Sequence, residues 1–180
     1  MRRTAIAARL ALPTDVHARQ SAAMVDHLLS TFEVAGAVVA FCWPHQAEPD
    51  IRAAVDPWRA KGCRVALPVV VGKGLPLVFR EWQANAPLVE DRYGIPTPAE
   101  GESLRPEWLF LPVNAFDARG YRLGYGGGYF DRTLAGIEPR PTVVGIGFES
   151  ARVESIRPEA HDQPLDWMVT EAGVWRFPRP

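Results

Sequence analysis

A glycine-rich stretch with charged flanks is the part of this sequence best suited to chemistry. Glycines stand at 120, 124, 126, 127 and 128, with Arg119, Arg122 and Arg132 around them and Asp117 and Asp131 at the two ends. Glycine allows positive φ and lets a ligand approach the backbone closely. Consecutive amides in such a loop can turn inward and bind an anion. The stretch therefore predicts a phosphate-binding loop.

An apolar pattern follows the loop and predicts a short helix. Phe130, Leu134 and Ile137 stand at i, i+4 and i+7, which is a helical spacing. Phosphate would then meet the amides and the dipole of a helix N-terminus. Asp131 is either an ordinary acid of a first helical turn or a Mg²⁺ ligand beside the phosphates. A tight strand-to-helix turn with surface arginines is the structural alternative for the whole motif.

Composition favours one globular domain over residues 1–180. Apolar residues make up 47% and charged residues 23%, and the net charge is −1 with dispersed basic residues, so no nucleic-acid partner is expected. Cys42 and Cys63 lack metal-site spacing and are expected to be reduced. Arg9 interrupts the first apolar run too early for a signal peptide, and no run reaches membrane-spanning length. We expect a cytoplasmic protein with no membrane contact.

Helical and strand patterns alternate along the chain. Helices are expected over 15–32 and 51–60, the second kinked at Pro57 or restarted there, and after the glycine loop. Strands are expected over 35–43, 64–71, 77–82, 107–113, 142–148, 167–170 and 174–177. This alternation predicts an α/β fold of three layers, with a mainly parallel sheet and helices on both faces. Ligands of such sheets bind beyond the carboxyl ends of the strands, where the glycine loop would lie.

Three other regions are candidates for function. Residues 85–106 form a long segment rich in proline and glycine, which indicates a functional loop. Glu48 follows a strand and could recognise an amide-like edge of a ligand, or could simply be solvated. His161, Asp162 and Asp166 could serve a metal or a base, or could be turn residues around Pro164. From these residues alone the chain is an α/β domain with a phosphate loop and Mg²⁺, without an assigned reaction.

The glycine motif also resembles a known family. The run from Ala115 to Arg132, with its Arg-Leu-Gly-Tyr-Gly-Gly-Gly-Tyr-Phe-Asp core, is similar to the signature of 5-formyltetrahydrofolate cyclo-ligases, also called methenyltetrahydrofolate synthetases. The resemblance extends in order to Trp43-Pro with Glu48-Pro-Asp50, to Tyr93-Gly-Ile-Pro96, and to His161-Asp-x-Pro-Leu-Asp166. It implies a fold similar to the ribose-phosphate isomerase and CoA-transferase class.

The resemblance implies an ATP-dependent and Mg²⁺-dependent ligase of one-carbon metabolism. Such an enzyme cyclises 5-formyltetrahydrofolate, with or without a polyglutamate tail, to 5,10-methenyltetrahydrofolate, and releases ADP and phosphate. The formyl oxygen takes the γ-phosphoryl group, which makes it a good leaving group, and N10 of the folate then attacks. Positioning and charge stabilisation are the main demands of phosphoryl transfer. A monomer is expected.

Residue roles are carried over from the family motif. Arg122 and Tyr129 are the expected catalytic residues, and Asp131 and Asp162 the expected Mg²⁺ ligands. ATP is expected at Arg2, Arg122, Leu123, Gly124, Tyr125, Gly126, Gly127, Gly128, Tyr129 and Phe130. The folate is expected at Cys42, Glu48, Tyr93, Tyr125, Gly126, Gly127, Gly128 and Tyr129.

One departure from the family keeps an alternative open. The family usually begins with a lysine and then an arginine that help to bind ATP, and here only Arg2 has a counterpart. The alternative function is therefore a folate- or nucleotide-binding relative without full catalytic activity.

Overall fold

A mixed sheet of eight strands runs through the middle of the molecule. The computed structural model describes residues 1–178, and its main sheet has the order β12-β11-β10-β7-β1-β2-β3-β6. The strands are β1 (Val38–Phe41), β2 (Arg64–Val69), β3 (Val78–Glu81), β6 (Ser103–Leu104), β7 (Trp108–Pro112), β10 (Thr142–Ile146), β11 (Trp167–Thr170) and β12 (Gly173–Arg176). The strands β11, β10, β7, β1 and β2 run parallel to one another, whereas β12 is antiparallel to β11, β3 to β2, and β6 to β3.

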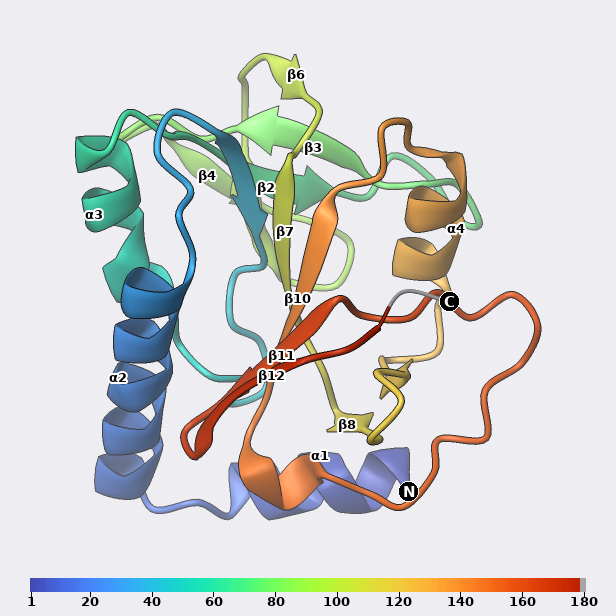
Figure 1. Ribbon diagram of the computed structural model, residues 1–180. Helices are drawn as coiled ribbons and strands as arrows, with labels where there is room; N and C mark the ends of the chain where they lie inside the picture. The colour runs from blue at the N-terminus through green and yellow to red at the C-terminus, as the bar shows by residue number, and fades with distance from the viewer. Residues whose placement is uncertain (179–180) are drawn as a thin grey trace.

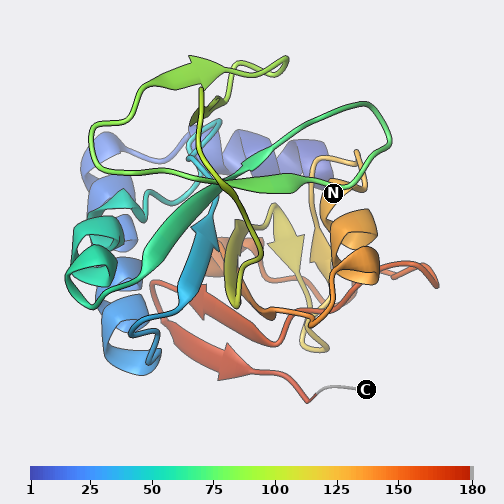
Figure 2. The same cartoon turned by 90° about the horizontal axis from the view of Figure 1, so that it is seen from above.

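Helices cover both faces of this sheet and one of its ends. Helices α2 (Thr14–Thr31) and α3 (Val55–Ala60) lie on one face, and α4 (Tyr129–Gly136) lies on the other, as Figure 2 shows from above. Helix α1 (Arg2–Leu10) crosses below the strand ends, next to the short strand β8 (Ala115–Phe116) (Figure 1). The predicted three-layer, mainly parallel α/β fold is confirmed.

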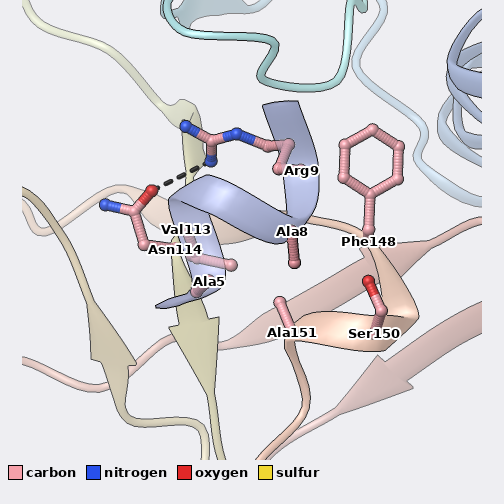
Figure 3. Close-up of a pocket in the computed structure, with 8 residues that line it drawn as sticks. All are labelled: Ala5, Ala8, Arg9, Val113, Asn114, Phe148, Ser150 and Ala151. Atoms are coloured by element: carbon pink, nitrogen blue, oxygen red, sulfur yellow. Dashed lines mark hydrogen bonds between the residues drawn. The ribbon is translucent and has the colours of Figure 1, made fainter. Parts of the chain in front are cut away.

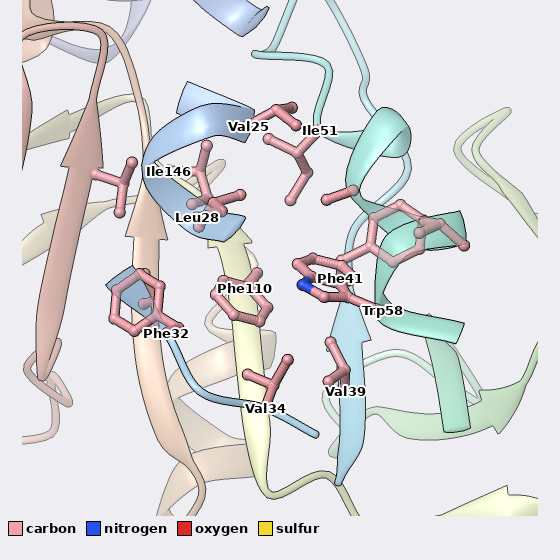
Figure 4. Packing of buried hydrophobic residues seen from close by; sticks show 14 of the residues in the cluster. Val25, Leu28, Phe32, Val34, Val39, Phe41, Ile51, Trp58, Phe110 and Ile146 are labelled. Atoms are coloured by element: carbon pink, nitrogen blue, oxygen red, sulfur yellow. The ribbon is translucent and has the colours of Figure 1, made fainter. Parts of the chain in front are cut away.

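Alternation along the strands builds two separate cores. In β1, Val39 and Phe41 pack with α2 and α3, whereas Ala40 packs on the opposite face with α4, because successive strand residues point to opposite sides. Trp58 of α3 stacks on Phe110 of β7, with ring centroids 4.9 Å apart (Figure 4). The same alternation continues past the strand, so that Cys42 packs on the α4 side and Trp43 on the α2 side.

Several local predictions needed correction. Helix α1 was not expected, because it holds only two large apolar residues, Ile6 and Leu10. The helix predicted over 51–60 is a 3₁₀ turn, Arg52–Ala54, followed by α3, with Pro57 in the first turn of α3. The segment 85–106 is not a bare loop, since it holds the hairpin β4 (Leu88–Glu90) with β5 (Pro96–Pro98) and the edge strand β6.

The connectivity places a topological switch point at β1 and β7, and a ligand crevice is expected beyond the carboxyl ends of these two strands. Strand β1 pairs with β2 on one side and with β7 on the other. The chain therefore continues from β1 to β2 on one side of β1 and later returns to its opposite side as β7. Open α/β sheets bind ligands beyond the carboxyl ends of strands at such a switch point. Here the segment with Glu48 follows β1 and the glycine loop follows β7. Within residues 1–178, no helix is long and apolar enough to span a membrane.

Candidate functional site

The glycine loop connects a small hairpin to a helix. Strand β8 pairs with β9 (Arg122–Leu123), and α4 begins at Tyr129 after Gly128 at its N-cap. Gly126 has φ +92° and Gly128 has φ +62°, a left-handed region that other residues enter at a cost. The glycines are therefore required by the turn that aims the loop at the start of α4, as the sequence predicted.

The backbone amides of this loop are available to a ligand. Among the described residues, none of the N–H groups from Gly124 to Gly128 donates a hydrogen bond to the backbone or a side chain. The first amides of α4 also lack an intrahelical acceptor, as at any helix N-terminus. A row of free donors next to a helix dipole is suited to phosphate oxygens.

Two arginine side chains lie against the loop. Arg2 of α1 donates from Nε to the Gly124 carbonyl at 2.7 Å, and its guanidinium covers Gly126, where an added Cβ would lie 2.9 Å from Nη1. Arg132 of α4 donates from Nη2 to the Gly127 carbonyl at 2.5 Å. The structure thus places two cations at the edge of the free amides, one of them from a helix more than a hundred residues away in sequence.

Arg122 and Asp131 form a mostly buried ion pair behind the loop. Arg122 Nη2 lies 2.9 Å from Asp131 Oδ1, with the two side chains 5% and 20% exposed. The same oxygen accepts the Gln163 amide at 3.0 Å, and Arg122 also donates to the Gln163 carbonyl. The guanidinium of Arg122 is therefore directed at Asp131 and residue 163, which locks the His161–Asp166 segment onto α4.

The donor set at this place suits Mg²⁺ only together with a phosphate ligand. Asp162 is next to Gln163 and so lies near Asp131; its Oδ2 accepts the Glu159 amide at 2.8 Å. Within residues 1–178, Asp131 Oδ2 accepts no hydrogen bond, and no group of three or more His, Cys, Asp or Glu side chains is arranged for a metal. Magnesium is commonly held by one or two carboxylates plus substrate phosphates. The two predicted carboxylates fit that pattern.

Glu48 is a buried carboxylate at the other side of the crevice. It is 3% exposed; its Oε1 accepts the Tyr125 hydroxyl at 2.8 Å and its Oε2 accepts the His45 amide at 2.9 Å. Burial raises the pKa of Glu48, and the bonds from Tyr125 and His45 and the charge of Arg9 oppose that rise. Burial and the nearby Glu48 charge raise the pKa of the Cys42 thiol. The predicted substrate residues Cys42, Glu48 and Tyr125 are thus brought together.

Arg9 connects these groups to helix α1. Its Nη1 donates to Asn114 Oδ1 at 2.9 Å and its Nη2 to the Tyr125 hydroxyl at 2.8 Å. Figure 3 shows Arg9 reaching from α1 to Asn114 beside a cavity of about 20 Å³ between α1 and the Phe148–Ala151 turn. Arg9 is only 6% exposed. A buried arginine is satisfied here by three acceptors, the third being the Gln46 carbonyl at 2.9 Å.

Tyr93 reaches the start of α4 from the β4–β5 hairpin. Its hydroxyl lies 3.0 Å from that of Tyr129, and the two rings meet edge to face at 6.3 Å. The hydrogen bond raises the pKa of Tyr129. The two residues predicted to bind substrate, Tyr93 and Tyr129, therefore contact each other, and the segment 85–106 reaches the start of α4 through Tyr93.

Sequence reasoning missed Arg9, Asn114 and Arg132. Arg132 was noted as a flanking charge and not as a site residue, although it follows Asp131 directly. Arg9 interrupts an apolar run, which was used only to exclude a signal peptide. Arg9 is seven residues from Arg2, a spacing that puts both side chains on one face of a helix. That spacing becomes informative only once α1 is known to be helical. Asn114 carries no signal in the sequence.

Comparisons with known proteins point to one family. The model of the 5-formyltetrahydrofolate cyclo-ligase family matches residues 1–171. The 5-formyltetrahydrofolate cyclo-ligase of Escherichia coli (strain K12) is 36% identical over 130 residues, which are 67% of this chain and 69% of that protein. That of Mycolicibacterium smegmatis is 29% identical over 157 residues, covering 79% and 77%.

Solved structures agree as well. The NMR structure of Aquifex aeolicus 5,10-methenyltetrahydrofolate synthetase superposes with a TM-score of 0.85 at 30% identity, over 99% of this chain and 92% of that one. The Mycoplasma pneumoniae 5,10-methenyltetrahydrofolate synthetase gives 0.78 at 17% identity, covering 94% and 96%, and supports the fold alone. From the match over nearly its whole length, this chain belongs to the 5-formyltetrahydrofolate cyclo-ligase family.

Proposed function

We propose that this chain cyclises 5-formyltetrahydrofolate to 5,10-methenyltetrahydrofolate, using ATP and releasing ADP and phosphate. The observation that carries the proposal is the position of Tyr125. Its backbone belongs to the loop of free amides, and its hydroxyl donates to the buried Glu48 carboxylate at 2.8 Å. A phosphate-binding loop and a pocket for a polar ring therefore share one residue, as a phosphoryl transfer from ATP to a folate requires.

The folate pocket would be built around Glu48. Each carboxylate oxygen accepts one hydrogen bond from the protein and can accept another, so Glu48 can take N–H donors from the edge of a pterin. Cys42 and the Tyr93–Tyr129 pair would contact the same substrate. The formyl group would then face the segment Tyr125–Tyr129 and the γ-phosphoryl group bound on its amides.

The phosphates would be held from two sides. The amides of Gly124–Gly128 and the helix N-terminus would bind their oxygens, and the guanidinium groups of Arg2 and Arg132 would balance their charge. Phosphorylation turns the formyl oxygen into a good leaving group, and N10 of the folate displaces it as phosphate when the ring closes. No covalent enzyme intermediate is needed, so positioning and charge stabilisation are the main contributions of the protein.

Asp131 and Asp162 would hold Mg²⁺ together with the phosphates. When bound, the ion would supply positive charge that offsets the negative charge developing during phosphoryl transfer. Arg122, directed at Asp131, would keep that carboxylate in place. The proposal also includes a monomeric, cytoplasmic enzyme that accepts folates with or without a polyglutamate tail.

The direct test is formation of the methenyl product. Purified protein is mixed with 5-formyltetrahydrofolate and MgATP, and the absorbance of 5,10-methenyltetrahydrofolate is followed, with ADP measured in parallel. Equal rates of methenyl product and ADP would support the proposal. Folded protein that binds the folate in calorimetry but releases no ADP would refute it in favour of a binding protein that lacks catalysis.

A further inference from the structure

The segment that carries Glu48 is strained and held from two helices. Gln46 has φ +48° and Ala47 has φ +55°, two successive left-handed residues that are not glycine, which costs energy unless the surroundings enforce it. Arg9 of α1 donates from Nε to the Gln46 carbonyl at 2.9 Å. His17 of α2 lies 3.2 Å and 3.0 Å, through Nε2, from the carbonyls of Ala47 and Glu48.

The same arginine fixes the direction of the hydrogen bonds around Glu48. Arginine is only a donor, so the Tyr125 hydroxyl, at 2.8 Å from Arg9 Nη2, accepts from Arg9. Its own proton is then directed to Glu48 Oε1, also at 2.8 Å. Arg9 Nη1 orients the Asn114 amide at the same time. One side chain thus sets the backbone before Glu48 and the hydroxyl that contacts its carboxylate.

Charged or titratable groups around Glu48 come from several elements. Arg9 comes from α1, Cys42 from the end of β1, Tyr125 from the glycine loop, and His17 from α2. His45, beside Glu48 in sequence, lies with its ring 6.0 Å from that of Tyr125. Arg9 is a permanent cation, so its charge favours an ionised Glu48 at every pH, in addition to the hydrogen bonds from the Tyr125 hydroxyl and the His45 amide.

We propose that Arg9 is the positioning residue of the folate pocket. It holds the strained Gln46–Glu48 segment and the Tyr125 hydroxyl in the arrangement that presents an ionised, oriented Glu48 carboxylate to the substrate. The inference rests on the proposed function, because it takes Glu48 as the group that receives the folate. It adds that α1, which reaches the glycine loop through Arg2, also fixes the opposite wall of the crevice through Arg9.

The test compares Arg9→Met with Arg9→Lys, Tyr125→Phe and a control, Arg19→Met. Arg19 lies on α2 with a side chain 71% exposed and 3.9 Å from Asp15, so its loss should change nothing at the site. Two properties are measured in each protein: the titration of the Glu48 side chain, followed by carboxyl-carbon NMR, and the steady-state constants for folate and ATP. Tyr125→Phe serves where Arg9→Met is too unstable, since Tyr125 is 44% exposed.

Arg9→Met should make Glu48 titrate at higher pH than in the wild type and raise KM for the folate about tenfold, the usual loss for a hydrogen bond to a charged group. The KM for ATP should change much less, and Arg9→Lys should recover part of the loss, since lysine keeps the charge without the fork geometry. Tyr125→Phe should shift the Glu48 titration in the same direction.

Two results would overturn the inference. One is a Glu48 titration in folded Arg9→Met and Tyr125→Phe that equals the wild type. The other is a rise in folate KM no larger than in Arg19→Met. Wild-type protein that neither binds nor converts the folate would refute the proposed function instead, and the NMR titration would then still decide whether Arg9 controls Glu48.

Discussion

Replacing Asp131 with alanine should cost stability as well as activity. The sequence alone predicts that this change abolishes turnover and leaves the fold intact, because Asp131 was assigned only to Mg²⁺. In the structure its Oδ1 pairs with Arg122 at 2.9 Å and accepts the Gln163 amide at 3.0 Å. The Arg122 side chain is 5% exposed, so alanine at 131 would leave a buried guanidinium without its counter-charge.

The size of the loss follows from that burial. Removing one partner of a buried ion pair costs about 3–5 kcal/mol. Arg122 keeps its bond to the Gln163 carbonyl, which favours the lower end, about 3 kcal/mol. For a chain of this length that loss lowers Tm by roughly 6–12 °C, at about 2–4 °C for each kcal/mol. Asp162→Ala removes one bond from the Glu159 amide and should cost only about 1 kcal/mol.

The two aspartates therefore make a matched pair for the assay. Thermal and urea unfolding of Asp131→Ala and Asp162→Ala are measured without ligands, and Mg²⁺-dependent ATP binding is measured by calorimetry on each folded variant. Both variants should lose Mg²⁺-dependent binding, but only Asp131→Ala should unfold much more easily. Equal stability losses in the two variants would refute the claim that the Arg122–Asp131 pair holds this part of the fold.

Three further predictions concern Glu48, the glycine loop and the Tyr93–Tyr129 contact. Burial raises the pKa of Glu48, and the proposed folate contact needs the ionised carboxylate. Folate affinity, measured by tryptophan fluorescence, should therefore begin to fall on acidification at a higher pH than it would for an ordinary glutamate. A folate affinity that stays constant over that pH range would contradict the prediction. Gly126 has φ +92°, so Gly126→Ala should lose about 1–2 kcal/mol of unfolding free energy. A Cβ added at Gly124 meets nothing within 4 Å, so Gly124→Ala should stay within about 0.5 kcal/mol of the wild type. Both are measured by urea unfolding, and equal losses in the two variants would refute the strain argument. Tyr93→Phe removes the hydroxyl 3.0 Å from Tyr129 and should raise KM for the folate a few-fold with unchanged Tm, and an unchanged KM would remove Tyr93 from the site.

Much of the fold could be predicted because its signals are local. Continuous apolar runs such as 107–113 indicate buried parallel strands, and the spacing of Phe130, Leu134 and Ile137 indicates a helix. The hairpin β4–β5 escaped prediction, because a strand pair with few apolar residues resembles a polar loop. Helix α1 escaped because it has only two large apolar residues, Ile6 and Leu10.

The sequence by itself determined the glycine loop. Its glycines are needed where the backbone takes positive φ, at Gly126 and Gly128, and that need is a property of the backbone at those residues. The family signature likewise identified Glu48, Asp131 and Asp162 as candidates.

Only the tertiary structure decided what those candidates contact. It paired Asp131 with Arg122 across nine residues, and it joined Glu48 to Tyr125 and to Arg9 from three separate parts of the chain. These contacts arise because β1 and β7 are neighbours in the sheet, so that the segments after them meet next to α1. The spacing of residues along the chain does not predict these contacts, because the contacts depend on long-range strand pairing rather than on a local pattern.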